Sequence, residues 1–115
     1  MHTVVETNAF RRAASDSGMS DAEVASVVDH VAADPERGDE IPGTGGCRKI
    51  RFAGRGKGKS GGYRVITFFS GPAIPVFLLT VFSKGERSDL AQSERNALRN
   101  ATKQIVSTYG ARAKR

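Results

Sequence analysis

Three strand-like segments follow one another in the second half of this chain, with no helical pattern between them. They occupy residues 47–52 (CRKIRF), 63–69 (YRVITFF) and 74–82 (IPVFLLTVF), and segments rich in turn-forming residues separate them. β-Branched and aromatic residues dominate the second and third segments, as expected of strands. Because the connections are loops and not helical crossovers, successive strands are expected to run antiparallel. The sequence therefore predicts a three-stranded meander.

The first strand of this meander has two unlike faces. One face consists of Arg48, Ile50 and Phe52, and the other of Cys47, Lys49 and Arg51. Since successive side chains of a strand point to opposite faces, this alternation predicts a half-buried strand. The third strand is apolar throughout, which is typical of a central strand covered on both sides, with Pro75 near its beginning.

Two helical segments precede the meander. The first follows a candidate strand over residues 2–5, is capped by Thr7 or Asn8, and ends at Gly18. The second begins at a capping box (SDAE, residues 20–23), in which the serine hydroxyl and the glutamate carboxylate each satisfy a free backbone N–H. Valines then recur at the i, i+3, i+4 and i+7 positions of one helix face, and an Asp-Pro pair at residues 34–35 ends the helix.

A third helix is predicted from Asp89 to about Thr108, followed by a small basic tail over residues 110–115. With 115 residues, 38% of them hydrophobic, the chain is expected to form a single domain around a modest core. We predict an α+β fold. A small curved antiparallel sheet, the meander with the candidate N-terminal strand added, is packed by two N-terminal helices and a C-terminal helix that cover one face.

Positive charge is concentrated around the loop between the first two strands of the meander. The stretch of residues 47–64 has no carboxylate and seven cationic side chains, namely Arg48, Lys49, Arg51, Arg55, Lys57, Lys59 and Arg64. Residues 1–47 carry a net charge of −6 and residues 48–115 a net charge of +12. This segregation indicates one anion-facing surface on an otherwise acidic body. A nucleic-acid backbone is the polyanion that best matches such a density of positive charge.

The loop itself, residues 53–60 (AGRGKGKS), is similar to a phosphate-binding P-loop, but Ala53 stands where the first glycine is required. A strand, not a helix, follows the loop, so an NTPase is disfavoured. Two interpretations remain: a flexible phosphate clamp, in which glycines let backbone N–H groups approach phosphates, or a solvated hairpin loop. The cations Lys49, Arg51 and Arg64 on the adjoining strands favour the clamp.

RNA cleavage through attack of the 2′-hydroxyl needs in-line positioning, charge stabilisation and proton transfer, and it needs no metal. Arg51 and Arg64 have planar donors suited to holding a phosphate, and Lys49 is suited to charge stabilisation or proton transfer. A metal nuclease is disfavoured because no carboxylate lies in the cluster, and we expect no cofactor. Tyr63 is a candidate either for the core or for stacking on a base.

Cys47 is the only cysteine, which fits a reducing cytosol, and no histidine lies near it in sequence, so a role as nucleophile is disfavoured. The N-terminal residues lack the pattern of a signal peptide. The longest apolar run, residues 72–82, is shorter than the roughly 20 residues that span a bilayer. We therefore expect a cytoplasmic protein that does not enter a membrane.

Three motifs together resemble the RelE/ParE superfamily of type II toxin–antitoxin toxins. They are CRKIRF (residues 47–52), SGGYRVI (60–66) and VFSKGERSDL (81–90), and the GRGKGKSGG loop (54–62) is particularly similar to HigB-like members. The resemblance covers most of the chain, and the order and spacing of the motifs make it specific. It implies a small curved antiparallel sheet packed with helices. For RelE-like members it also implies a metal-independent endoribonuclease that enters the ribosomal A site and cuts the mRNA there.

The resemblance implies roles for individual residues. Lys49 and Arg51 match the two lysines of the family's catalytic strand, one of them replaced by arginine, and Arg64 matches the arginine that holds the scissile phosphate. Lys84 lies at the basic strand end, so these four residues are the predicted catalytic group. The residues predicted to bind RNA or phosphate are Arg48, Arg55, Lys57, Lys59, Tyr63 and Arg87.

The chain departs from RelE at two positions. Gly85 stands where RelE has an arginine, and Ala91 stands where RelE has a tyrosine assigned to proton transfer. The proton-transfer group is therefore missing from its expected place. The candidates to substitute for it are Lys57, Lys59 and Lys84.

A toxin of this kind implies a cognate antitoxin, which in HigB-type systems is commonly a HigA-like helix-turn-helix protein that also binds its operator DNA. The ribosome and mRNA would be the other partners. Two further functions stay open: a ParE-like inhibitor of DNA gyrase on the same fold, which needs no basic cleft, and a non-catalytic nucleic-acid-binding protein, which would not need the missing tyrosine. Replacement of Arg64 by alanine separates these alternatives.

Overall fold

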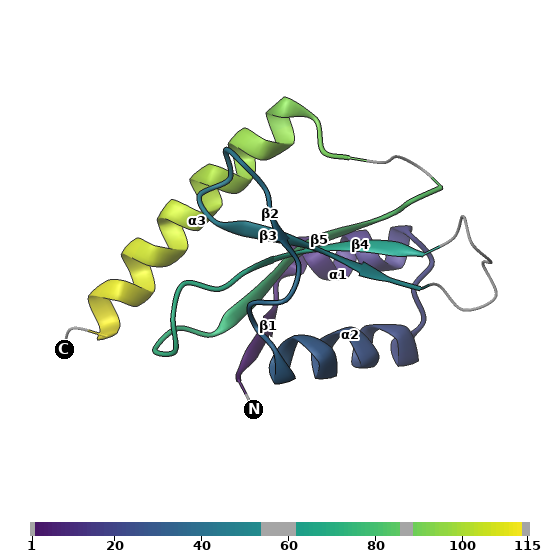
Figure 1. The fold of residues 1–115 in the computed structure, drawn as a ribbon, viewed down its shortest axis with the longest axis horizontal. Helices are drawn as coiled ribbons and strands as arrows, with labels where there is room; N and C mark the ends of the chain where they lie inside the picture. The colour runs from purple at the N-terminus through teal and green to yellow at the C-terminus, as the bar shows by residue number, and fades with distance from the viewer. Residues whose placement is uncertain (1, 54–61, 86–88, 114–115) are drawn as a thin grey trace.

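The computed structural model describes residues 2–53, 62–85 and 89–113, with side chains described up to Tyr109. Within these ranges it has three helices and five strands (Figure 1). In chain order they are β1 (Val4–Glu6), α1 (Asn8–Asp16), α2 (Asp21–Ala33), β2 (Asp39–Glu40), β3 (Cys47–Phe52), β4 (Tyr63–Phe68), β5 (Val76–Ser83) and α3 (Gln92–Ala113).

The strands form one sheet in the order β1-β5-β4-β3-β2. β3, β4 and β5 pair antiparallel in sequence order, which confirms the predicted meander. β1 pairs with β5 in parallel, so the N-terminal strand does belong to the sheet. β2 was not predicted, because its two residues lie in a segment rich in glycine and proline that indicated only a loop. The fold is thus α+β in class, with a mostly antiparallel sheet.

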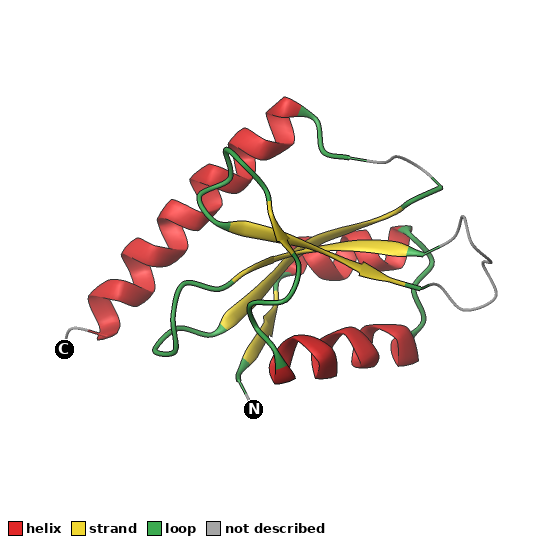
Figure 2. Cartoon of the chain, viewed as in Figure 1, coloured by secondary structure: helices red, strands yellow, loops and turns green. Residues whose placement is uncertain are grey.

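The prediction that all helices cover one face of the sheet is wrong. Figure 2 shows α1 and α2 on one side of the sheet and α3 on the other. The core is correspondingly divided into two clusters: Phe10, Val27 and Val31 pack with one face of β4 and β5, and Leu90 and Leu98 pack with the opposite face. The physical reason lies in β4, whose six residues are all buried and therefore require cover on both faces.

The helix boundaries follow local chemistry. The Thr7 hydroxyl accepts a hydrogen bond from the Phe10 N–H at 3.1 Å, and the capping box predicted at Ser20 and Glu23 is confirmed. α2 ends at Ala33, just before the Asp-Pro pair at residues 34–35. α3 begins three residues later than predicted and continues to Ala113, so most of the predicted tail is helical. None of the helices in the described ranges combines the length and the apolarity that crossing a bilayer requires.

Gly38 fixes the approach of the chain to β2. Its φ is +98°, and a Cβ built there would lie 2.7 Å from both the Lys49 carbonyl oxygen and the Ile50 Cγ1. Gly18 also has a positive φ, +78°, but a Cβ added there would meet nothing within 4 Å. Alanine substitutions at the two positions therefore differ in one respect: both introduce the strain of a positive φ, and only the one at Gly38 also introduces a steric clash.

We expect Gly38→Ala to lower the free energy of unfolding by about 3 kcal/mol, because conformational strain and the clash with β3 add. Gly18→Ala should lower it by only about 1 kcal/mol, since it introduces the strain alone. Urea denaturation of the two variants and the wild type measures both values. Equal losses in the two variants would contradict the close packing of Gly38 against β3.

Candidate nucleic-acid interface

The register of β3 against β4 brings three predicted site residues together. Arg51 lies directly opposite Arg64, and Lys49 is two residues before Arg51 on the same strand. Side chains at i and i+2 share a face, and directly opposed residues have Cβ atoms about 5 Å apart. Lys49, Arg51 and Arg64 therefore lie on one face of the sheet, the face that also carries Ile66 and packs against α3 farther along.

Arg64 is the least exposed residue of this cluster. Its side chain is buried, with 8% of the residue exposed, and its Nη1 donates to the Tyr63 carbonyl oxygen at 3.4 Å. Burial, and secondarily the nearby Arg51, lowers the pKa of Arg64 from its ordinary value. Arginine nevertheless stays protonated at neutral pH. Two guanidinium groups held opposite each other repel, so the arrangement favours an anion between or above them.

A carboxylate that sequence reasoning did not place in the cluster lies beside Lys49. The Asp89 Oδ1 is 3.6 Å from the Lys49 Nζ, and its Oδ2 is 3.3 Å from the Arg95 Nη2. A hydrogen bond from the Leu90 N–H lowers the pKa of Asp89, and the two cations lower it further, so the side chain is ionised at neutral pH. Asp89 is 40 residues from Lys49 in the chain, which is why no local pattern signals this contact.

Comparison with known protein families agrees with this fold. The family described as "RelE toxin of RelE / RelB toxin-antitoxin system" matches residues 2–114. The chain belongs to the RelE toxin family. The resemblance of the sequence to RelE/ParE-type toxins is thus confirmed, and the protein is a type II toxin that has a cognate antitoxin as its partner.

Two residues predicted to contact RNA lie away from the cluster of the toxin. Arg48 is on the opposite face of β3, where its Nη1 donates to the Gly38 carbonyl oxygen at 3.0 Å and its Nη2 lies 3.5 Å from Glu40. Tyr63 is 2% exposed in the core beneath α1 and α2, so its ring is not accessible to a base. Of the two roles that the sequence left open for Tyr63, its burial favours the structural one. Because side chains alternate along a strand, Arg48 and Tyr63 both lie on the face of the sheet opposite to Lys49.

Lys84 lies at the hairpin end of the same sheet. It is exposed, and its backbone N–H donates to the Gly62 carbonyl oxygen at 3.1 Å, which places it next to the beginning of β4. The other cations predicted to bind phosphate lie outside the described residues, so their placement stays a prediction. They are Arg55, Lys57, Lys59 and Arg87.

Cys47 and the histidines of the toxin do not take part in the cluster. Cys47 is fully buried, and burial raises the pKa of its thiol to about 11, so it is protonated and unreactive at neutral pH. His2 contacts the Ile74 carbonyl oxygen, and His30 lies on α2 and contacts the Ser26 carbonyl oxygen. Among residues 2–53, 62–85 and 89–109, no three His, Cys, Asp or Glu side chains come together in a way that would hold a metal ion.

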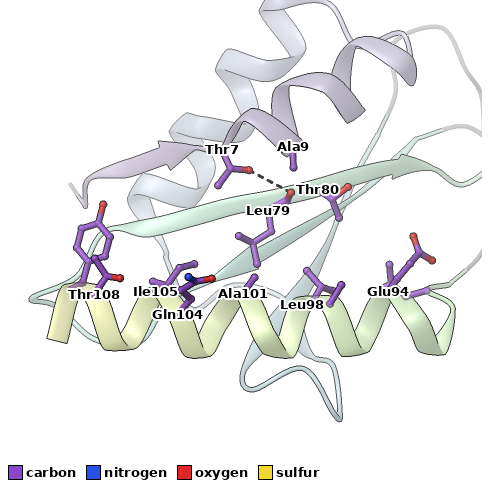
Figure 3. Close-up of a pocket in the computed structure, with 13 residues that line it drawn as sticks. Thr7, Ala9, Leu79, Thr80, Glu94, Leu98, Ala101, Gln104, Ile105 and Thr108 are labelled. Atoms are coloured by element: carbon purple, nitrogen blue, oxygen red, sulfur yellow. Dashed lines mark hydrogen bonds between the residues drawn. The ribbon is translucent and has the colours of Figure 1, made fainter. Parts of the chain in front are cut away.

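An apolar groove of about 550 Å³ lies between α3 and β5 of the toxin (Figure 3). Leu79, Leu98 and Ile105 line it, and the small side chain of Ala101 leaves it open. At its other wall the Thr7 hydroxyl donates to the Leu78 carbonyl oxygen at 2.8 Å, and the Leu79 carbonyl oxygen lies 3.4 Å from the same hydroxyl (Figure 3). Among the described residues that line it, the one charged group is the Glu94 carboxylate, so this groove does not have the chemistry of a nucleic-acid site.

Proposed function

We propose that this toxin is a metal-independent endonuclease that cuts mRNA on the ribosome and thereby inhibits translation. The observation that carries the proposal is the placement of Arg51 directly opposite Arg64, with Lys49 on the same face of the sheet. A gyrase inhibitor that acts by protein contact has no need of a buried arginine on the same face of the sheet as two other cations. A phosphodiester in a single strand has the charge and the size that such a cluster can hold.

In the proposed reaction the mRNA 2′-hydroxyl attacks the adjacent phosphorus. The bond from phosphorus to the 2′-oxygen forms and the bond to the 5′-oxygen breaks, which leaves a 2′,3′-cyclic phosphate and a 5′-hydroxyl. Arg64 and Arg51 hold the non-bridging oxygens, whose negative charge grows in the transition state, and Lys49 adds to that stabilisation. The 2′-hydroxyl gives its proton to solvent water, which acts only as the base and does not attack phosphorus. The leaving 5′-oxygen takes a proton from the Lys84 ammonium, our candidate donor.

The proposal extends to the surroundings of the reaction. Arg55, Lys57, Lys59 and Arg87 bind the phosphates that flank the cleaved one, because they border the strand ends on which the cluster lies. The partners are the ribosome with its mRNA and a HigA-like helix-turn-helix antitoxin, through which the toxin would reach operator DNA. These partners place the toxin in the cytoplasm.

Purified wild-type toxin is expected to cut a defined mRNA when the mRNA is bound to 70S ribosomes with an empty A site. The 3′ ends of the upstream products should carry a 2′,3′-cyclic phosphate, because no water molecule takes part in the attack. End-group analysis by mass spectrometry measures this directly, and toxin pretreated with EDTA and desalted should act at the same rate. Products with 5′-phosphate ends would contradict the 2′-hydroxyl mechanism, and the absence of cleavage would contradict the function.

A further inference from the structure

Asp89 is an acidic residue beside the proposed site, and its carboxylate is held at several points. Oδ1 accepts a hydrogen bond from the Leu90 N–H at 2.8 Å and lies 3.6 Å from the Lys49 Nζ. Oδ2 accepts from the Arg95 Nη2 at 3.3 Å, and Arg95 is on the first turn of α3. Both oxygens are therefore engaged, and these contacts hold the carboxylate, whose side chain is 49% exposed, between the beginning of α3 and β3.

Lys49 depends on such a fixed partner more than its arginine neighbours do. A lysine ends in a compact ammonium on a flexible four-carbon stem, whereas an arginine has a planar fork that keeps its direction. The Lys49 side chain is 28% exposed, so packing alone does not fix its ammonium. The charged groups that face it from the neighbouring elements are Asp39 on β2, Arg51 on β3, Arg64 on β4, Asp89 before α3 and Arg95 on α3.

Among these groups of the described chain, Asp89 is the one that forms an ion pair with Lys49. Asp39 is the cross-strand neighbour of Lys49 on β2 and is exposed, and the three arginines repel the Lys49 ammonium. We propose that Asp89 is a positioning residue, whose carboxylate holds the Lys49 ammonium beside Arg51 and Arg64 so that it meets the scissile phosphate. This inference rests on the proposed function and adds to it a residue that acts through Lys49.

The position of Asp89 has a second consequence, of opposite sign. A carboxylate beside the phosphate-binding face repels RNA, so its negative charge weakens binding while its hold on Lys49 speeds the reaction. Asp89→Asn should therefore lower kcat by about 10-fold, because misplaced catalytic groups lose rate steeply. The same variant should lower KM by roughly 3-fold, because one repulsive charge is removed. A residue that only stabilised the fold would not improve binding while it slowed the reaction.

The test uses full-length toxin and ribosomes programmed with a defined mRNA, with kcat and KM measured for four single variants. Asp89→Asn removes the charge, Asp89→Glu retains it, and Lys49→Met removes the partner. Asp29→Asn is the matched control, since it makes the same chemical change on the exposed surface of α2. The double variant Asp89→Asn/Lys49→Met completes a cycle that isolates the coupling between the two residues.

The proposal expects Asp89→Glu to keep at least about a third of the wild-type kcat, since the carboxylate can still reach the ammonium. In the Lys49→Met background Asp89→Asn should change kcat by less than about 2-fold, because the group it positions is gone. Additive effects in the cycle, or equal losses in Asp89→Asn and Asp89→Glu, would overturn the proposal while the function stands. If Asp89→Asn does not fold, the cycle is run with Asp89→Glu instead: its smaller effect on kcat should disappear in the Lys49→Met background, and an effect that persists there would overturn the proposal. Absence of cleavage by the wild type would overturn the function itself.

Discussion

Arg64→Ala is expected to reduce the rate of mRNA cleavage on the ribosome by about 10²–10³-fold, the loss typical when one preorganised donor to a developing charge is removed. Arg64 is buried and lies directly opposite Arg51 in the sheet, and its Nη1 donates to the Tyr63 carbonyl oxygen, so the direction of its side chain is set before the substrate arrives. Neither Lys49 nor Arg51 can take its place, because their backbone positions are on the adjacent strand. Single-turnover cleavage of a labelled mRNA on 70S ribosomes measures the rate.

Two matched variants show whether the loss is specific. Arg64→Lys keeps the positive charge but loses the planar fork, and it should recover only a small part of the rate. Arg48→Ala removes an arginine from the opposite face of β3, and it should leave the cleavage rate per folded molecule unchanged. A large loss in Arg48→Ala would contradict the assignment of the cluster to one face of the sheet.

The same Arg64→Ala variant separates the alternative functions in cells. If the toxin cuts mRNA, induction of Arg64→Ala should neither arrest growth nor produce new mRNA 5′ ends, whereas the wild type does both. A gyrase inhibitor should arrest growth equally with and without Arg64. A non-catalytic nucleic-acid binder should lose only about 1–3 kcal/mol of binding energy from one contact. Growth arrest by Arg64→Ala without cleavage would therefore refute the nuclease proposal.

Much of the site was predictable because strand alternation needs only the sequence. The pattern of residues 47–52 puts Lys49 and Arg51 on one face, and a hairpin with the next strand brings Arg64 near them. The exact pairing of Arg51 with Arg64 was not predictable, because a connection of ten residues does not fix the register as a two-residue turn does. The same alternation already separated Arg48 from this face, although its charge made it a candidate.

The remaining features depend on tertiary packing. Asp89 meets Lys49 only because α3 lies across the face of the sheet that carries the cluster, and no local pattern specifies which face a helix covers. The burial of Tyr63 likewise follows from the position of α1 and α2 on the other face. The apolar run of residues 74–82 did indicate that β5 is covered on both sides. The structure agrees with that indication and not with the prediction that all helices cover one face.

Phe10→Ala is expected to lower the free energy of unfolding by about 4 kcal/mol, within the range for loss of a buried phenylalanine ring. Phe10 is fully buried in the cluster with Val27 and Val31 of α2 and Val76 and Leu78 of β5, so its ring joins both N-terminal helices to the sheet. A domain of this size has about 5–15 kcal/mol of stability in total, so the variant should lose a large part of it. The melting temperature should fall by about 15 °C.

The location of Phe10 makes this a test of function as well as of packing. It lies on the face of the sheet opposite to Lys49, Arg51 and Arg64, so each folded molecule should cut mRNA at the wild-type rate. Cleavage assayed at low temperature, where the variant is still folded, compares these rates, and thermal denaturation followed by circular dichroism measures the stability. Val106→Ala on the exposed surface of α3 is the control, with an expected change of less than about 0.5 kcal/mol. A folded Phe10→Ala variant that no longer cuts mRNA would show that the two faces of the sheet are coupled, and the site could not then be treated as the Lys49, Arg51 and Arg64 cluster alone.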